Sequence, residues 1–123
     1  GVGIDFTRRD LQAIAKDKGR PWDVAKGFDQ SAPISAILPA SEVSQLSDAE
    51  ISLKVNGEMR QQAQLSDMIW SVPEIICELS KFFELKPGDI IYTGTPSGVT
   101  AVIKGDRITA SVAGIGSLDF KIV

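Results

Sequence analysis

The feature that most constrains the fold is a predicted β-hairpin near the middle of the chain. Ile51, Leu53 and Val55 alternate with polar residues, which is the two-residue period of a strand with one buried face. Asn56-Gly57 follows directly, and both of these residues tolerate the positive φ angles that a two-residue hairpin turn requires. The chain is therefore expected to return antiparallel through residues 58–65, which makes this region antiparallel sheet.

Further strands and two helices are predicted on either side of this hairpin. The other strands are expected at residues 1–5, 33–38, 90–92, 108–112 and 118–122. Thr7 with Asp10, and Ser71 with Glu74, have the spacing of helix N-cap pairs, which predicts helices over about 7–18 and 71–83. The second helix carries a wide apolar face that is expected to pack on the core, with Cys77 buried beside it.

The order of these elements indicates the fold class. Strands and helices do not alternate regularly, which disfavours a doubly wound parallel sheet. We expect a mixed α+β, mostly β fold with a curled, largely antiparallel sheet and two helices, forming a single domain over residues 1–123.

Composition excludes several classes of function. The 123 residues include no histidine and a single cysteine, which removes histidine-based catalysis, histidine-bound zinc and an intrachain disulfide. A net charge of −3 without a basic stripe argues against nucleic-acid binding, and no apolar run is long enough to span a membrane. The absence of a targeting signal and the unpaired cysteine favour the cytoplasm. Catalysis would have to use carboxylates, Lys, Arg, hydroxyls or a hard metal ion.

Three segments are candidates for such chemistry. Asp5 ends a predicted strand, where a carboxylate can bind Mg²⁺ or Mn²⁺. Arg9 and Gln12 lie one turn apart on the following helix, where the guanidinium can bind a substrate carboxylate. The alternative is that Asp5 is a helix-entry carboxylate and Arg9 a solvated charge, since one carboxylate does not make a metal site.

The other two segments are the surroundings of Lys26 and the loop 93–98. Lys26 lies between small residues near two aromatics and is suited to an enolate or a carboxylate, although the local sequence alone favours a surface lysine in a loop. The loop, with the sequence TGTPSG, follows an apolar strand. Its backbone N–H groups and the hydroxyls of Thr93 and Thr95 suit an anionic oxygen, and a purely structural turn is the alternative.

In combination and in this order, the segments resemble the fumarylacetoacetate hydrolase family. The matching segments are GVGIDFTRRDLQ (1–12), PWDVAKGFDQSAP (21–33), LKVNGEMRQ (53–61), DMIWSVPEII (67–76), LKPGDIIYTGTPSGV (85–99) and GDRITASVAGIGSL (105–118). The resemblance covers essentially the whole chain. The short stretch between Gln12 and Pro21 is similar to the small acylpyruvate or fumarylpyruvate hydrolase branch of the family.

The resemblance implies a role for each candidate residue. Asp5 matches a metal ligand for Mg²⁺ or Mn²⁺, and Arg9 and Gln12 match residues that contact substrate. Lys26 matches the active-site lysine, which with Arg9 would be catalytic, and Thr93 matches the first threonine of the T-G-T-P motif. The fold implied is the rolled β-sheet assembly of the family's C-terminal portion, and the partners implied are a small 2-oxo acid and a second copy in a homodimer.

The resemblance also implies an activity. It is metal-dependent hydrolysis of a C–C bond in acylpyruvates, giving pyruvate and a carboxylic acid. Oxaloacetate decarboxylation or keto–enol tautomerisation at the same site, and a non-catalytic subunit that keeps only the fold, are the alternatives. The family's Glu-x-Glu metal ligands and its water-activating His and Glu would lie before Gly1. We therefore expect this chain to be the C-terminal portion of a longer catalytic domain, and inactive by itself.

Overall fold

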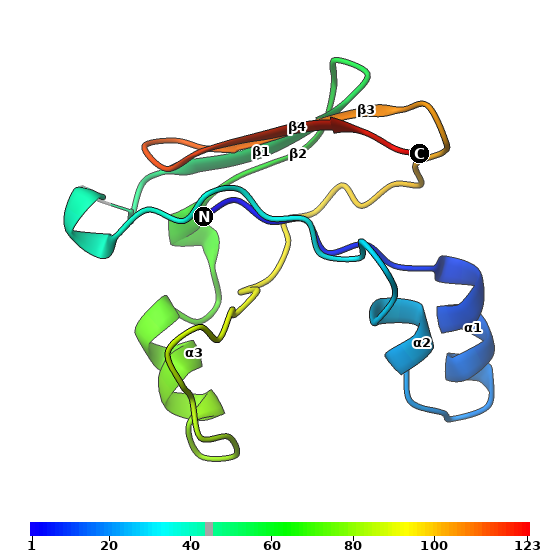
Figure 1. Cartoon of the computed structure of the whole chain (residues 1–123), viewed down its shortest axis with the longest axis horizontal. Helices are drawn as coiled ribbons and strands as arrows, with labels where there is room; N and C mark the ends of the chain where they lie inside the picture. The colour runs from blue at the N-terminus through cyan, green and yellow to red at the C-terminus, as the bar shows by residue number, and fades with distance from the viewer. Residues whose placement is uncertain (44–45) are drawn as a thin grey trace.

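The computed structural model describes residues 1–43 and 46–123, and its centre is one antiparallel sheet. The strands are β1 (Glu50–Val55), β2 (Glu58–Gln64), β3 (Arg107–Val112) and β4 (Gly116–Lys121). Their order across the sheet is β2-β1-β3-β4, and every neighbouring pair is antiparallel (Figure 1). The expected mixed α+β fold with a largely antiparallel sheet is therefore confirmed.

The predicted hairpin is present and contains a bulge. Asn56 and Gly57 both adopt positive φ, at 52° and 83°, as a two-residue turn between β1 and β2 requires. Leu53 pairs with Gln61, whereas the next residue, Lys54, pairs with Met59. One residue of β2, Arg60, is therefore left out of the pairing, which increases the local twist of that strand.

The core lies between the inner face of the sheet and the N-terminal segment. Residues 1–6 run alongside residues 31–35, with Ile4 N–H donating to the Pro33 carbonyl at 3.0 Å and a single bridge between Gly3 and Ile34. The predicted strands 1–5 and 33–38 thus pair with each other and do not join the sheet. The buried cluster is made of Val2, Ile4, Ala49, Val55, Ile108, Ala110 and Val112.

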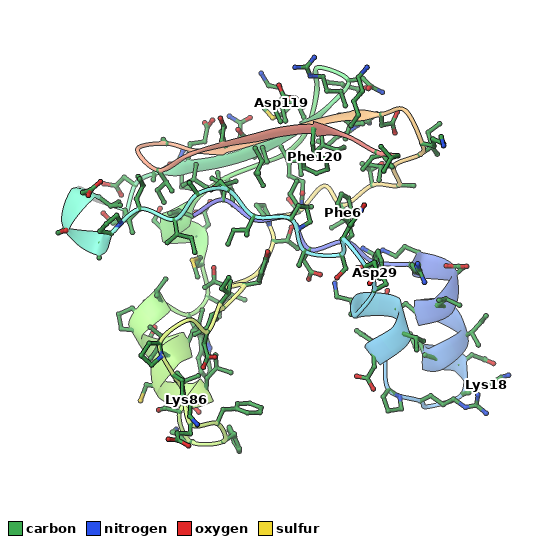
Figure 2. All side chains as sticks on the ribbon, in the orientation of Figure 1. Phe6, Lys18, Asp29, Lys86, Asp119 and Phe120 are labelled. Atoms are coloured by element: carbon green, nitrogen blue, oxygen red, sulfur yellow. The ribbon has the colours of Figure 1, made fainter. Side chains whose placement is uncertain are left out.

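One aromatic pair links this segment to the sheet. Phe6 meets Phe120 of β4 edge to face, with ring centroids 6.2 Å apart (Figure 2). Such a pair adds about 0.5–1.5 kcal/mol beyond the area it buries. The strand predicted at 90–92 is not formed: the chain has no strand structure there and runs from the region of α3 toward the sheet (Figure 1).

The first helical region begins later than predicted. Helix α1 spans Arg9–Asp17, and a short second helix, α2 (Asp23–Lys26), packs beside it (Figure 1). Thr7 was expected to cap α1, but the N-cap is Arg8 and no side chain caps the helix. The Thr7 hydroxyl instead accepts a hydrogen bond from the Lys26 ammonium at 2.9 Å, so a tertiary contact takes the group that would have capped the helix.

The second predicted helix forms but is shorter and more exposed than expected. Helix α3 spans Val72–Leu79, and its predicted capping box between Ser71 and Glu74 is confirmed. Its apolar residues do not pack on the core: Phe82 and Phe83, beyond its end, are 78% and 62% exposed, and Cys77 is exposed. The chain also forms two short 3-10 helices, η1 (Ala40–Glu42) and η2 (Leu65–Asp67). Among the described residues, no helix is both long and apolar enough to span a membrane.

Candidate active site

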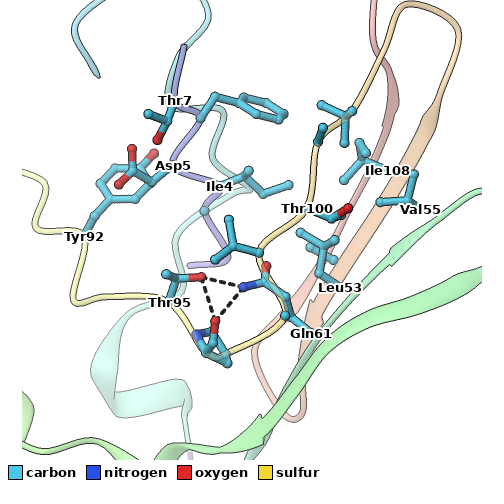
Figure 3. A pocket seen from close by; sticks show the side chains of 18 of the residues that line it. Ile4, Asp5, Thr7, Leu53, Val55, Gln61, Tyr92, Thr95, Thr100 and Ile108 are labelled. Carbon is cyan, nitrogen blue, oxygen red and sulfur yellow. Dashed lines mark hydrogen bonds between the residues drawn. The ribbon is translucent and has the colours of Figure 1, made fainter. Parts of the chain in front are cut away.

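A cavity of about 560 Å³ lies between the inner face of the sheet, the N-terminal segment and the loop 93–98 (Figure 3). Its floor is formed by apolar residues of β1 and β3. Its polar wall brings together side chains from distant parts of the sequence, among them Asp5, Thr7, Arg9, Asp10, Gln12, Lys26, Gln61 and Thr95. Four of the five residues expected in the site therefore line one cavity.

Asp5 and Lys26 form the charged centre of this wall. The Lys26 ammonium nitrogen lies 2.5 Å from a carboxylate oxygen of Asp5 and 2.9 Å from the Thr7 hydroxyl oxygen. The Lys26 side chain is 34% exposed, so it is neither a freely solvated lysine nor a buried one. Helix α2 ends at Lys26 and places it there, because the Arg8 N–H bonds the Ala25 carbonyl and joins the two segments.

Arg9 and Gln12 form a pair on the first turns of α1. A terminal guanidinium nitrogen of Arg9 donates to the amide oxygen of Gln12 at 3.1 Å, as the three-residue spacing predicts. This bond leaves the amide NH₂ of Gln12 and the remaining N–H groups of Arg9 available. All of these free groups are donors, which suits carboxylate or carbonyl oxygens of a substrate.

The loop 93–98 contributes a different threonine from the one the family resemblance indicates. Thr95 lines the cavity, and its hydroxyl oxygen accepts a hydrogen bond from the amide of Gln61 at 2.7 Å (Figure 3). Thr93 lines only a neighbouring cavity of about 750 Å³ along β2, η2 and α3, which also has Thr95 in its wall. The structure thus brings Thr95, and not Thr93, together with Asp5 and Lys26.

Tyr92 closes the cavity beside Asp5. Its hydroxyl donates to the Ala32 carbonyl at 2.7 Å, and its ring covers Gly3 so closely that a Cβ there would lie 2.5 Å from a ring carbon. Partial burial, and secondarily the negative charge of Asp5, raise the pKa of Tyr92 above its ordinary value. The phenol therefore stays neutral at neutral pH.

The donor set can be tested against a divalent metal ion. Within residues 1–43 and 46–123, no three His, Cys, Asp or Glu side chains come close enough to hold a metal together. The cavity offers two carboxylates, that of Asp5, whose side chain is half exposed, and that of Asp10, together with the hydroxyl of Thr7. These oxygen atoms fit a hard cation such as Mg²⁺ or Mn²⁺, but they amount to part of a coordination shell.

Comparison with known proteins gives the family. The family described as fumarylacetoacetate (FAA) hydrolase C-terminal matches residues 1–123. The chain belongs to the fumarylacetoacetate hydrolase family. A fumarylpyruvate hydrolase of Ralstonia sp. is 46% identical over 98% of the chain and 62% of its own length. The mitochondrial oxaloacetate tautomerase FAHD1 of Bos taurus is 45% identical over 97% of the chain and 54% of its own length.

A solved structure of the same family extends the comparison. The fumarylpyruvate hydrolase of Pseudomonas aeruginosa, in complex with Mn²⁺ and pyruvate, has a TM-score of 0.94 at 50% identity. It is matched over 98% of this chain and 52% of its own length. The chain thus spans about half the length of the family members it matches.

Two residues of the cavity were not found as candidates from the sequence. Gln61 was only part of a matching hairpin segment, and Tyr92 only part of an apolar run. Neither is charged, and neither has a fixed spacing to another candidate. The one signal was position: Tyr92 directly precedes the TGTPSG loop, and Gln61 lies in the hairpin strand that faces it.

Proposed function

We propose that the full-length protein is a metal-dependent hydrolase that cleaves a C–C bond in acylpyruvates, releasing pyruvate and a carboxylic acid. The observation that carries this proposal is the composition of the cavity wall. Lys26, Arg9, Gln12 and Thr95 present hydrogen-bond donors or positive charge, and Asp5 and Asp10 present carboxylates. Such a wall suits an anionic 2-oxo acid together with a cation. The similarity to fumarylpyruvate hydrolases supports the same assignment.

The chain's own side chains would bind and orient the substrate. The free N–H groups of Arg9 and Gln12 would hold the oxygen atoms of the 2-oxo acid end, which fixes the position of the distal carbonyl. The Thr95 hydroxyl reaches the same cavity from the opposite segment of the chain. Held at its 2-oxo acid end from two sides, the substrate would lose most of its translational freedom before reaction.

Lys26 would act on the charge that develops during the reaction. Water adds to the distal carbonyl carbon, the bond to the adjacent carbon breaks, and the electron pair passes to the pyruvate fragment as an enolate. The Lys26 ammonium, fixed by Asp5 and Thr7, would stabilise the negative oxygen of that enolate. A divalent ion, held in part by Asp5, would supply Lewis acidity when bound. We expect its other ligands, and the groups that activate water, outside these 123 residues.

The proposed metal role of Asp5 can be tested by substitution in the full-length protein. Asp5→Asn removes the charge with almost no change of shape, and we expect loss of Mn²⁺- or Mg²⁺-dependent acylpyruvate hydrolysis by at least about 100-fold. Asp17→Asn, an exposed carboxylate at the end of α1, is the matched control. Unchanged hydrolysis by Asp5→Asn across a metal titration would refute the proposed role.

A second function is supported by an equally close relative. Identity to the bovine oxaloacetate tautomerase is 45%, against 46% for the Ralstonia fumarylpyruvate hydrolase, so identity does not separate the two. Tautomerisation or decarboxylation of oxaloacetate also passes through an enolate that Lys26 would stabilise. The two proposals are separated by assaying the full-length protein with fumarylpyruvate, oxaloacetate and enol-oxaloacetate. Turnover of enol-oxaloacetate with intact fumarylpyruvate would favour the tautomerase, and no turnover of any substrate would favour a non-catalytic subunit.

Two further expectations concern oligomeric state and location. The protein is expected to be a homodimer, as in the family, with a small 2-oxo acid as its ligand. The cytoplasm is expected on a different ground, the unpaired cysteine. Sedimentation equilibrium of the full-length protein tests the first, and cell fractionation tests the second.

A further inference from the structure

One polar side chain of the cavity has no part in the mechanism above. Gln61 is half-buried on β2 and reaches from the sheet to the loop 93–98 (Figure 3). It directly follows Arg60, the unpaired residue of the β-bulge. The loop comes unusually close to the strand there. A Cβ at Gly98 would lie only 1.9 Å from the Arg60 carbonyl oxygen. The amide of Gln61 is therefore held against the loop by the backbone of both segments.

The neighbours of this amide determine how it is oriented. The same nitrogen of Gln61 lies 2.7 Å from the Pro96 carbonyl oxygen and 2.7 Å from the Thr95 hydroxyl oxygen. A carbonyl oxygen can only accept a hydrogen bond, so the amide must present its NH₂ group, not its oxygen, to Pro96. That NH₂ group has two hydrogen atoms, and the two contacts use both.

This orientation fixes the chemical role of the Thr95 hydroxyl. Its oxygen accepts one of the Gln61 hydrogens, so its own proton remains to be donated. The hydroxyl also donates to the Pro96 carbonyl oxygen at 3.5 Å, which is long for an O–H···O hydrogen bond, so a closer acceptor in the cavity competes favourably for this proton. The hydroxyl proton is thus available to a ligand in the cavity.

We infer that Gln61 is a positioning residue that sets the Thr95 hydroxyl as a hydrogen-bond donor toward a carboxylate oxygen of the 2-oxo acid in the cavity. This inference rests on the proposed function. Gln61 acts through Thr95 and does not itself contact the substrate. A hydrogen bond to a charged oxygen is stronger than one between neutral groups, so the orientation of a single proton alters affinity measurably.

The test is a double-mutant cycle in the full-length protein, read as the Kd of pyruvate in the presence of Mn²⁺. Gln61→Met keeps the length of the side chain and removes both donors. We expect it to weaken pyruvate binding about tenfold, because the Thr95 hydroxyl is then free to turn away. In a Thr95→Val background, which has no hydroxyl to orient, the same substitution should weaken binding less than about twofold.

A second variant reverses the hydrogen-bonding character without removing it. The carboxylate of Gln61→Glu can only accept, so Thr95 would donate to it and not to the ligand. Pyruvate binding should therefore weaken more than in Gln61→Met, and it should recover as the pH falls and the glutamate becomes protonated. Gln62→Met, on the next residue of β2 with its side chain bonded to Glu50 outside this cavity, is the matched control and should bind pyruvate as the wild type does.

The outcomes separate this inference from the proposed function. If Gln61→Met weakens binding equally with Thr95 or Val at position 95, Gln61 is merely structural and the inference is overturned. A wild-type protein that binds no pyruvate overturns it as well. If the effect of Gln61→Met on pyruvate binding depends on Thr95, but the wild-type protein hydrolyses no acylpyruvate, the inference is supported and the proposed hydrolase is overturned. If the wild-type protein hydrolyses an acylpyruvate but the effect of Gln61→Met does not depend on Thr95, the proposed hydrolase is supported and the inference is overturned.

Discussion

At the scale of single residues, the cavity depends on contacts between side chains far apart in the sequence. Lys26 is held at 2.5 Å from Asp5 and at 2.9 Å from Thr7, so its ammonium has a defined position before any ligand enters. A fixed charge need not reorganise when negative charge develops nearby, which is why such groups contribute strongly to catalysis. The same arrangement explains why Thr7 does not cap α1.

We expect Lys26→Met to lower kcat/KM of the full-length protein for acylpyruvates by about 10²–10³, since it removes the charge that would stabilise the enolate. Steady-state kinetics measure this effect. Lys104→Met, an exposed lysine in the turn before β3, is the control and should leave kcat/KM within about twofold. Full activity of Lys26→Met would contradict the role proposed for this residue.

At the scale of elements, the loop 93–98 is positioned by its approach to the bulged strand β2. Gly98 has a φ of 97° and lies against the Arg60 carbonyl, whereas Gly94 has a φ of 122° and nothing within 4 Å of where a Cβ would stand. Comparing substitutions at the two glycines therefore separates the cost of backbone strain from the cost of steric contact. Of the two, only Gly98 also needs to lack a Cβ so that the loop can approach the sheet this closely.

Gly94→Ala should lower the free energy of unfolding by about 1–2 kcal/mol, which is the cost of positive φ for a residue with a Cβ. Gly98→Ala should cost roughly 1–3 kcal/mol more, because its Cβ also collides with the backbone of β2. Chemical denaturation of both variants beside the wild type measures the difference. Equal losses would show that the approach of the loop to β2 is not constrained at Gly98.

The turn before β3 supplies a pH-dependent contribution to stability. The Asp106 carboxylate accepts hydrogen bonds from the Ile103 N–H at 2.9 Å and from the Asn56 amide at 2.8 Å. These bonds, the backbone one first, lower the pKa of Asp106 below its ordinary 3.8. A carboxylate whose pKa is lower in the folded state stabilises the fold above its unfolded pKa, and this contribution is lost as the pH falls through the folded pKa.

Asp106→Asn should therefore be less stable than the wild type at pH 7, and the difference should shrink as the pH falls below about 3.8. Thermal unfolding of both proteins from pH 7 to pH 2.5 measures this convergence. Asp48→Asn, an exposed carboxylate before β1, controls for the change in net charge. A difference in Tm that is constant across this range would contradict the assigned hydrogen bonds.

At the scale of the whole molecule, the described residues supply the substrate-binding groups that the proposed chemistry needs but only part of a metal-binding site. The cavity has donors for an anionic substrate but only two carboxylates, Asp5 and Asp10, for a cation, and no cluster of three metal-binding side chains exists in the described part of the chain. The family members it matches are about twice as long. These two facts are consistent with a metal centre completed by residues outside this sequence.

Residues 1–123 alone should consequently bind Mn²⁺ weakly, with a Kd in the roughly millimolar range or above, because the two carboxylates of the cavity are a poor ligand set. The full-length protein should bind at least about 100-fold more tightly. Titration followed by the water-proton relaxation of Mn²⁺ measures both, and Asp5→Asn should weaken the residual binding of the short chain. Tight binding by residues 1–123 would contradict the partial donor set.

The sequence by itself determined the local elements, because turn and capping preferences act between neighbouring residues. Asn56-Gly57 predicted the hairpin, and Ser71 with Glu74 predicted the start of α3. The pairing of the N-terminal segment with residues 31–35, the use of Thr7 by Lys26, and the choice of Thr95 over Thr93 in the cavity were decided by the tertiary structure. These outcomes depend on which distant backbone lies alongside, and residue spacing carries no information about that.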